Sequence, residues 1–269
     1  MTNTSTRPYP WLEYVILVVA TFLAIEAKRQ FGLFAHQVFG PPGAPGGSAF
    51  VLSLEEWLQI CLVALACLVH WQTRLPAAPW LERKLYGWHE GEKIYVWRPA
   101  RVAVLLVLAY VAVYAIVVAH LGFTSKLGAQ LHSPNLPKPV LVKLAALYPV
   151  AAIGAAISEE NVYRFAVLSL LVWLIRLAVP RLREQRALGL WLPIVIGGIY
   201  FGYVHVAENI ETVRTGSMVI DVLTTPQTFA GIVFGYVYCR FGLEAAMVTH
   251  GASDLTAPVL LKLLQALHG

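Results

Sequence analysis

The chain is a succession of long apolar runs, and this feature limits its fold more than any other. A helix needs about 20 mostly apolar residues to cross the hydrocarbon core of a bilayer. The runs cover approximately residues 11–27, 52–71, 102–122, 140–179, 190–206, 229–238 and 243–264. Because backbone polar groups inside lipid must be satisfied within the spanning element, such runs favour helices. The sequence therefore predicts an all-α, polytopic transmembrane helix bundle with seven or eight spans.

The composition agrees with a membrane protein. Hydrophobic residues make up 58% of the 269 residues and charged residues only 13%, whereas an average soluble domain is about 25% charged. The formal net charge is +5, but Lys and Arg lie in short gaps between the apolar runs. This placement is typical of topology signals and of contacts with anionic headgroups. It argues against nucleic-acid binding and predicts membrane lipids as partners.

The runs divide the chain into two predicted regions. Residues 1–138 form an N-terminal transmembrane region with three spans and an aromatic and basic loop at residues 74–101. Residues 139–269 contain the polar clusters described below and form the second predicted region. Short basic loops tend to face the cytoplasm, which predicts that loops 74–101 and 181–186 are cytoplasmic. We expect an integral, multi-pass protein of a bacterial or archaeal plasma membrane.

The longest run, residues 140–179, is too long for one straight crossing. As a helix it extends about 60 Å, twice a hydrocarbon core of about 30 Å. Ser158 is followed by Glu159 and Glu160, and a serine with acidic residues in the next turn is a frequent helix start. The sequence therefore predicts a broken helix at this point.

The same segment carries the first polar cluster. Glu160 and Arg164 are four residues apart with the acid first, the better orientation for an ion pair on one helix face. Glu159 points about 100° away and has no partner on its own helix. A paired acid beside an unpaired one predicts two carboxylates with different roles. The alternative for this cluster alone is a structural salt bridge.

Two further clusters lie in later apolar runs. His205 ends one run, a turn after Phe201, and His250 and Asp254 lie four residues apart in the last run. Ionisable residues in a membrane are costly and usually functional. Facing inward, the three clusters would form one polar pocket suited to water activation or to metal-assisted hydrolysis. A proton relay in a transporter is the alternative.

In this order and spacing, the clusters resemble the motifs of the CPBP family of membrane proteases, which includes type II CAAX prenyl endopeptidases and bacteriocin-immunity relatives. They match EExxxR (Glu159, Glu160 and Arg164), FxxxH (Phe201 and His205) and HxxxD (His250 and Asp254). The resemblance covers approximately residues 140–264 and implies that residues 139–269 are a protease-like catalytic core. This chain has Phe165 where many members have Gly, and Asp254 where many have Asn.

The resemblance implies an intramembrane endopeptidase that hydrolyses a peptide bond with activated water. The implied roles are water activation (Glu159), water positioning (His205), pocket shape (Glu160 and Arg164) and oxyanion stabilisation (His250 and Asp254). The family's customary label implies a divalent metal such as zinc, with Glu159, His205 and His250 as candidate ligands, while a mechanism without metal uses the same side chains. The expected substrate is a protein or peptide, with or without an attached lipid. A non-catalytic scaffold or immunity protein of the same family and a proton or metal transporter are the alternatives.

Overall fold

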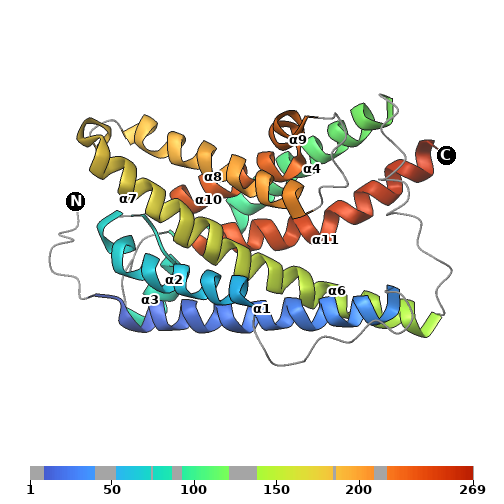
Figure 1. Cartoon of the computed structure of the whole chain (residues 1–269), viewed down its shortest axis with the longest axis horizontal. Coiled ribbons are helices and arrows are strands. Elements are labelled where there is room, and N and C mark those ends of the chain that lie inside the picture. The colour runs from blue at the N-terminus through green and yellow to red at the C-terminus, as the bar shows by residue number, and fades with distance from the viewer. Residues whose placement is uncertain are drawn as a thin grey trace.

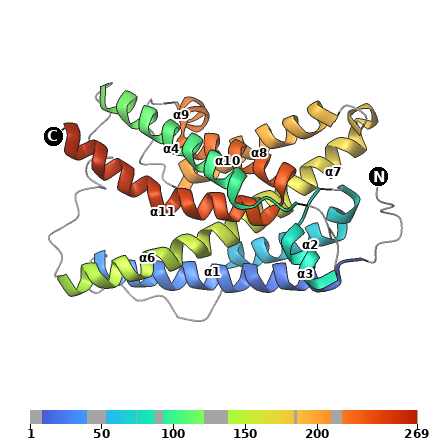
Figure 2. The same cartoon turned by 180° about the vertical axis from the view of Figure 1, so that it is seen from behind.

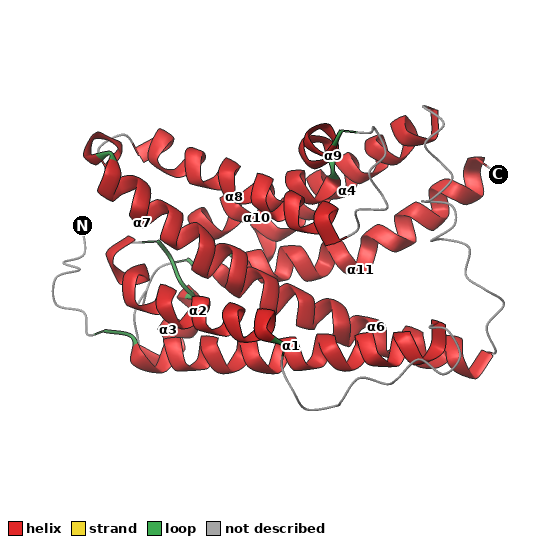
Figure 3. Ribbon diagram, viewed as in Figure 1, coloured by secondary structure: helices red, strands yellow, loops and turns green. Residues whose placement is uncertain are grey.

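The computed structural model describes residues 9–39, 53–73, 75–86, 93–120, 138–183, 186–208 and 217–268. These residues form a helical bundle without strands (Figures 1 and 3), so the predicted all-α class is confirmed for them. The elements are α1 (Trp11–Phe39), α2 (Leu54–Thr73), α3 (Pro79–Tyr86), α4 (Trp97–His120), α6 (Lys138–Glu159), η2 (Glu160–Leu168), α7 (Ser169–Ala178), η3 (Pro180–Arg183), α8 (Arg186–Glu208), α9 (Met218–Thr224), α10 (Pro226–Phe241) and α11 (Leu243–His268). η2 is a π-helix and η3 is a 3₁₀-helix.

Several helices are long and apolar enough to cross a membrane. In the described part of the chain they are Leu54–Thr73, Trp97–Val117, Ala146–Ala178 and Gly189–Ala207. α9 and α10, bent by 46° at their junction, qualify together as a fifth span. α1 and α11, which cover the first and last expected spans, are not among them. A multi-pass membrane protein is therefore supported, while the predicted count of seven or eight spans is not confirmed.

The break predicted near Ser158 is not confirmed. The chain stays helical from α6 through η2 to α7, and the flanking residues Glu159 and Ser169 both keep right-handed helical dihedral angles. Ser158 does not cap a new helix, because its hydroxyl donates to the carbonyl of Gly154 in the preceding turn (2.9 Å). Serine commonly makes this bond within helices. The helix instead widens into π-winding over the EExxxR motif, and π segments are frequent at functional sites.

The long helix α6–η2–α7 crosses the molecule obliquely and separates two groups of helices (Figures 1 and 2). α1 runs beside α6 along one side of the bundle. α4, α8, α10 and α11 lie on the other side of the long helix. This arrangement brings segments that are far apart in sequence against the π-helical motif.

Glycines set the close contact of α8 with α10. A Cβ atom at Gly198 would lie 2.9 Å from the backbone nitrogen of Ile232, and one at Gly231 would lie 2.9 Å from the Cα of Gly198. A Cβ at Gly202 would overlap the hydroxyl of Thr228. Small residues allow helix backbones to approach each other in this way. Gly202 therefore permits the close approach of the two helices at this point.

Phe165, which stands where many family members have Gly, fills the core beside the motif. Its side chain is fully buried, with ring centroids 4.7 Å from His70 and 5.9 Å from Tyr14. His70 in turn contacts the hydroxyl of Tyr238 through Nε2 (3.1 Å). The large residue therefore packs α1, α2 and η2 together without disturbing the motif.

Candidate active site

The six candidate side chains come from the continuous helix α6–η2–α7, from α8 and from α11, and they meet in one cluster. Their positions are the end of α6 (Glu159), η2 (Glu160 and Arg164), the last turn of α8 (His205) and α11 (His250 and Asp254). Contacts of 2.8 to 3.8 Å between charged or titratable groups connect all six. The tertiary structure thus brings together residues up to 95 positions apart (159 to 254).

Glu160 is held from both sides. Its side chain is fully buried, with Oε1 2.8 Å from His250 Nδ1 and Oε2 3.3 Å from Arg164 Nε. Arg164 is also buried, and its guanidinium lies over the rings of Phe201 (4.4 Å) and Phe234 (5.3 Å). The predicted Glu160–Arg164 pair is therefore present. Two restraining contacts suit a carboxylate that shapes the pocket better than one that must take and release a proton.

Glu159 has a different set of neighbours. Its Oε2 lies 3.8 Å from the Nε2 atoms of both His205 and His250. Its Oε1 accepts a hydrogen bond from Lys28 Nζ of α1 at 2.7 Å. The expectation that Glu159 lacks a partner on its own helix holds, but the carboxylate is not unpaired, because α1 supplies a cation. One oxygen is thereby engaged and the other faces two imidazoles.

The backbone fixes the orientation of His205. Its Nδ1 lies 2.8 Å from the carbonyl oxygen of Phe201, one turn earlier in α8. A carbonyl oxygen can only accept, so Nδ1 carries the proton in this contact and the neutral ring leaves Nε2 as an acceptor. That nitrogen is the one that faces Glu159. The FxxxH spacing therefore sets the tautomer as well as the direction of the ring.

His250 lies among three carboxylates. Nδ1 contacts Glu160 (2.8 Å), whereas Nε2 lies 3.3 Å from Asp254 Oδ2 and 3.8 Å from Glu159 Oε2. Imidazole can donate from both nitrogens at once only as the imidazolium cation. The ring of Phe234 stacks on it with centroids 4.9 Å apart. Asp254 is thus paired with His250, which balances the charge that an aspartate adds at this position.

Lys28 reaches the cluster because α1 packs closely along the long helix. The carbonyl oxygen of Ala24 would lie only 3.2 Å from a Cβ at Gly154, so glycine permits the approach. Asn161 Nδ2 donates to Thr21 Oγ1 at 2.8 Å and fixes the register of the two helices. Residues 21, 24 and 28 follow helical spacing on one face. Thr21 and Lys28 lie seven residues apart and so share this face, which was the signal available for Lys28 beyond the end of the predicted run at residue 27.

A cavity of about 290 Å³ leads to this cluster. α1, the start of α2, the long helix and α8 line it, and its walls include Glu159 and His205. Charged side chains at its rim come from outside the motifs: Lys28 and Arg29 from α1, and Glu55 and Glu56 from α2. The helices of residues 1–138 therefore form part of the wall of the candidate site.

The expected metal ligands do not form a metal site in this arrangement. Among the described residues, no group of three or more acidic, histidine or cysteine side chains is placed to hold a metal ion. His250 shows the reason, since Glu160 and Asp254 engage both of its ring nitrogens and a metal ligand needs a free lone pair there. We therefore derive no catalytic step through a metal.

Comparison with known proteins identifies the segment that carries the site. Residues 141–256 match the family model of type II CAAX prenyl endopeptidase Rce1-like proteins. This match supports the resemblance to the CPBP family. No curated protein and no solved structure matches the chain.

The Rce1-like segment extends from α6 into α11 and includes all six candidate residues. Members of this family are usually intramembrane proteases, and the match supports a CAAX-protease-like membrane protein. The match lies within the predicted core of residues 139–269, and it leaves out α1 to α4. Lys28 therefore contacts the Rce1-like segment from a helix outside it.

Proposed function

We propose that the protein is an intramembrane endopeptidase that hydrolyses a peptide bond with water activated by Glu159. One observation supports this function above all. Glu159 Oε2 lies 3.8 Å from Nε2 of His205 and of His250, which is too long for direct hydrogen bonds. Polar groups at such separations are often bridged by water. A water beside this oxygen would lie at the end of the cavity through which a peptide can approach.

Glu159 and His205 would together orient and activate that water. With the Nδ1 proton of His205 directed to the Phe201 carbonyl, its Nε2 accepts one hydrogen of the water and orients the molecule. Glu159 Oε2 takes the other hydrogen as a proton while the water oxygen attacks the carbonyl carbon of the substrate. The protonated Glu159 then gives the proton to the leaving nitrogen as the C–N bond breaks, a general base followed by a general acid.

His250 would stabilise the negative charge that develops on the substrate oxygen. It is the only one of the two histidines with carboxylates at both ring nitrogens. These contacts favour the imidazolium form, and its positive charge in a water-poor site would stabilise a developing oxyanion. Glu160, Arg164 and Asp254 would act through His250 by holding its ring in place.

Lys28 would prepare Glu159 for its role. Its ammonium group engages Oε1 and so leaves Oε2 directed toward the histidines. A neighbouring cation also favours the ionised carboxylate, the form that accepts a proton. Since the Lys28 side chain is 55% exposed, water screens part of this effect.

The decisive experiment compares membranes that contain the wild-type protein with membranes that contain Glu159→Gln. Mass spectrometry of protein termini should find new termini with the wild type only, and these identify the substrate. Identical termini in both membranes would count against a protease and favour the scaffold or immunity alternative. Proton or metal flux that disappears in Glu159→Gln, without any cleavage, would instead favour the transporter.

A further inference from the structure

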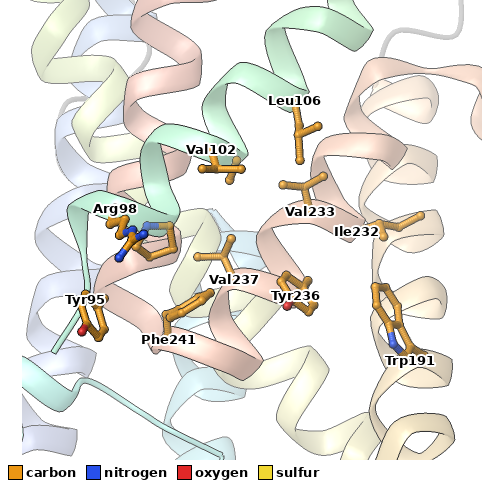
Figure 4. A pocket seen from close by; sticks show the side chains of 12 residues that line it. Tyr95, Arg98, Val102, Leu106, Trp191, Ile232, Val233, Tyr236, Val237 and Phe241 are labelled. Atoms are coloured by element: carbon orange, nitrogen blue, oxygen red, sulfur yellow. The ribbon is translucent and has the colours of Figure 1, made fainter. Parts of the chain in front are cut away.

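A second cavity, unrelated to the motif residues, lies between α4, α8 and α10 (Figure 4). It encloses about 660 Å³, within the range of about 300–1,000 Å³ that is usual for small-molecule sites. Its walls are almost entirely apolar and include Val102, Leu106, Ile232 and Val233. We call it the α4 groove. In size and lining it fits a hydrocarbon chain.

The α4 groove opens on the surface that faces lipid. Val102 is 58% exposed and Leu106 is 51% exposed, although both lie in a predicted membrane span. Tyr236 and Trp191 are also partly exposed on the opposite wall. The hydrocarbon around the protein therefore has direct access to the groove.

One end of the α4 groove is basic and aromatic. Arg98 is its one charged lining residue, and Tyr95 and Phe241 lie beside it (Figure 4). Arg101 and Arg240, on the same two helices, are exposed nearby in sequence. Tyrosine and basic residues typically mark the headgroup level of a bilayer, and clustered basic residues attract anionic lipids.

We propose that the α4 groove binds one acyl chain of an anionic phospholipid, with the phosphate of that lipid at Arg98. The apolar walls suit the acyl chain, and the basic end suits the phosphate headgroup. The two parts of the groove follow each other as the acyl chain and headgroup do in a phospholipid. This inference does not depend on the protease function, because its residues are separate from the catalytic cluster. About 21 Å of α8 separates Trp191 in the groove from His205, at about 1.5 Å per residue.

The test is native mass spectrometry of the full-length protein after extraction into detergent, with phosphatidylglycerol or phosphatidylcholine added. The wild type should retain one phosphatidylglycerol molecule at detergent levels that remove other lipids. Val102→Trp fills the groove and should lose that molecule. Val113→Trp is the matched control, since Val113 lies on the same helix with 59% exposure but does not line the groove, and it should keep the lipid.

A second pair of variants tests the headgroup contact. Arg98→Gln should weaken phosphatidylglycerol binding by about fivefold, the effect of one basic residue at an anionic surface, and leave phosphatidylcholine binding unchanged. Arg101→Gln, on the same helix outside the groove, should change it less. Equal lipid retention in Val102→Trp and Val113→Trp would overturn the proposal, because it would show surrounding lipid only. Recovery of a lipid-modified peptide in place of a phospholipid would overturn it as well.

Discussion

The catalytic cluster and the α4 groove both lie against the helix α10, and they differ in size and in chemistry. One face of α10 serves the catalytic cluster, where Gly231 accepts a hydrogen bond from Arg164 and Phe234 stacks on His250. The other face, with Ile232, Val233, Tyr236 and Val237, lines the α4 groove. The first cavity is small and rimmed by charge, whereas the second is larger and apolar.

The difference shows how a bundle in lipid can keep reactive polar groups beside an apolar site. A buried charge is tolerated when opposite charges and hydrogen bonds surround it, and the cluster provides these for Glu160 and Arg164. The α4 groove needs no such partners, because its walls are apolar and an acyl chain bound there replaces other lipid hydrocarbon. Changes to the cluster should therefore alter chemistry and stability strongly, and changes to the groove should alter lipid binding alone.

The largest expected effect is on turnover. Glu159→Gln keeps the size of the side chain but removes the base, so we expect cleavage to fall by about 10²- to 10⁴-fold, the usual contribution of a general base. The protein should remain folded, as shown by an unchanged elution profile and thermal melt. Val113→Trp in the lipid-facing surface is the control and should cleave normally. Wild-type turnover in Glu159→Gln would exclude the role proposed for this residue.

The next largest effect is on stability. Glu160→Gln or Arg164→Ala removes one member of a buried ion pair and leaves the other charged, which costs about 3–5 kcal/mol. Thermal or denaturant unfolding of the purified protein should show this loss. Arg98→Gln at the exposed rim of the α4 groove should change the stability of the lipid-free protein by less than about 0.5 kcal/mol. Similar losses in the cluster and at the rim would contradict the distinction between the two cavities.

A smaller effect should follow from a change in α10, the helix that contacts both the catalytic cluster and the α4 groove. A methyl group at Gly231 meets the backbone of Gly198, so Gly231→Ala should destabilise the protein by about 1–3 kcal/mol through overpacking of α8 against α10. Gly32→Ala is the matched control, because nothing lies within 4 Å of a Cβ at that position of α1. That variant should melt at the wild-type temperature or slightly above it.

The smallest effect concerns Lys28, and it appears in the pH dependence of cleavage. Activity that needs an ionised Glu159 is lost as the pH falls. Removal of a neighbouring cation makes protonation easier, so in Lys28→Gln this loss should occur at a higher pH than in the wild type. Lys28→Arg should restore the wild-type profile. Arg29→Gln should not move it, because Arg29 is bound to Glu26 of its own helix at 2.6 Å.

A measurement without substrate can check the same point. Dicyclohexylcarbodiimide modifies protonated carboxyl groups, so labelling of Glu159 in Lys28→Gln should begin at a higher pH than in the wild type. The same labelling profile in both proteins would show that Lys28 has no influence on Glu159, whether or not a cleavable substrate is known.

Contacts within one helix could be predicted from the sequence, because helical periodicity determines which residues share a face. The pairs Glu160–Arg164 and His250–Asp254 are each four residues apart, and the structure finds both in contact. The predicted helix break at Ser158 was not confirmed, because a serine hydroxyl that can cap a helix can also bond to a carbonyl in the preceding turn. The sequence does not distinguish these two uses, which depend on whether the chain continues as a helix.

The sequence by itself determined the all-α class, the membrane environment and the three motifs, because these depend on apolar length and on spacing along one helix. Only the tertiary structure decided that Glu160 holds His250, that Lys28 of α1 reaches Glu159, and that an apolar groove lies behind α10. These contacts could not be predicted from the sequence because they join residues that are far apart along the chain. Contacts over 90 or 131 positions arise from the close packing of helices at small residues, and local periodicity does not encode which helices will meet.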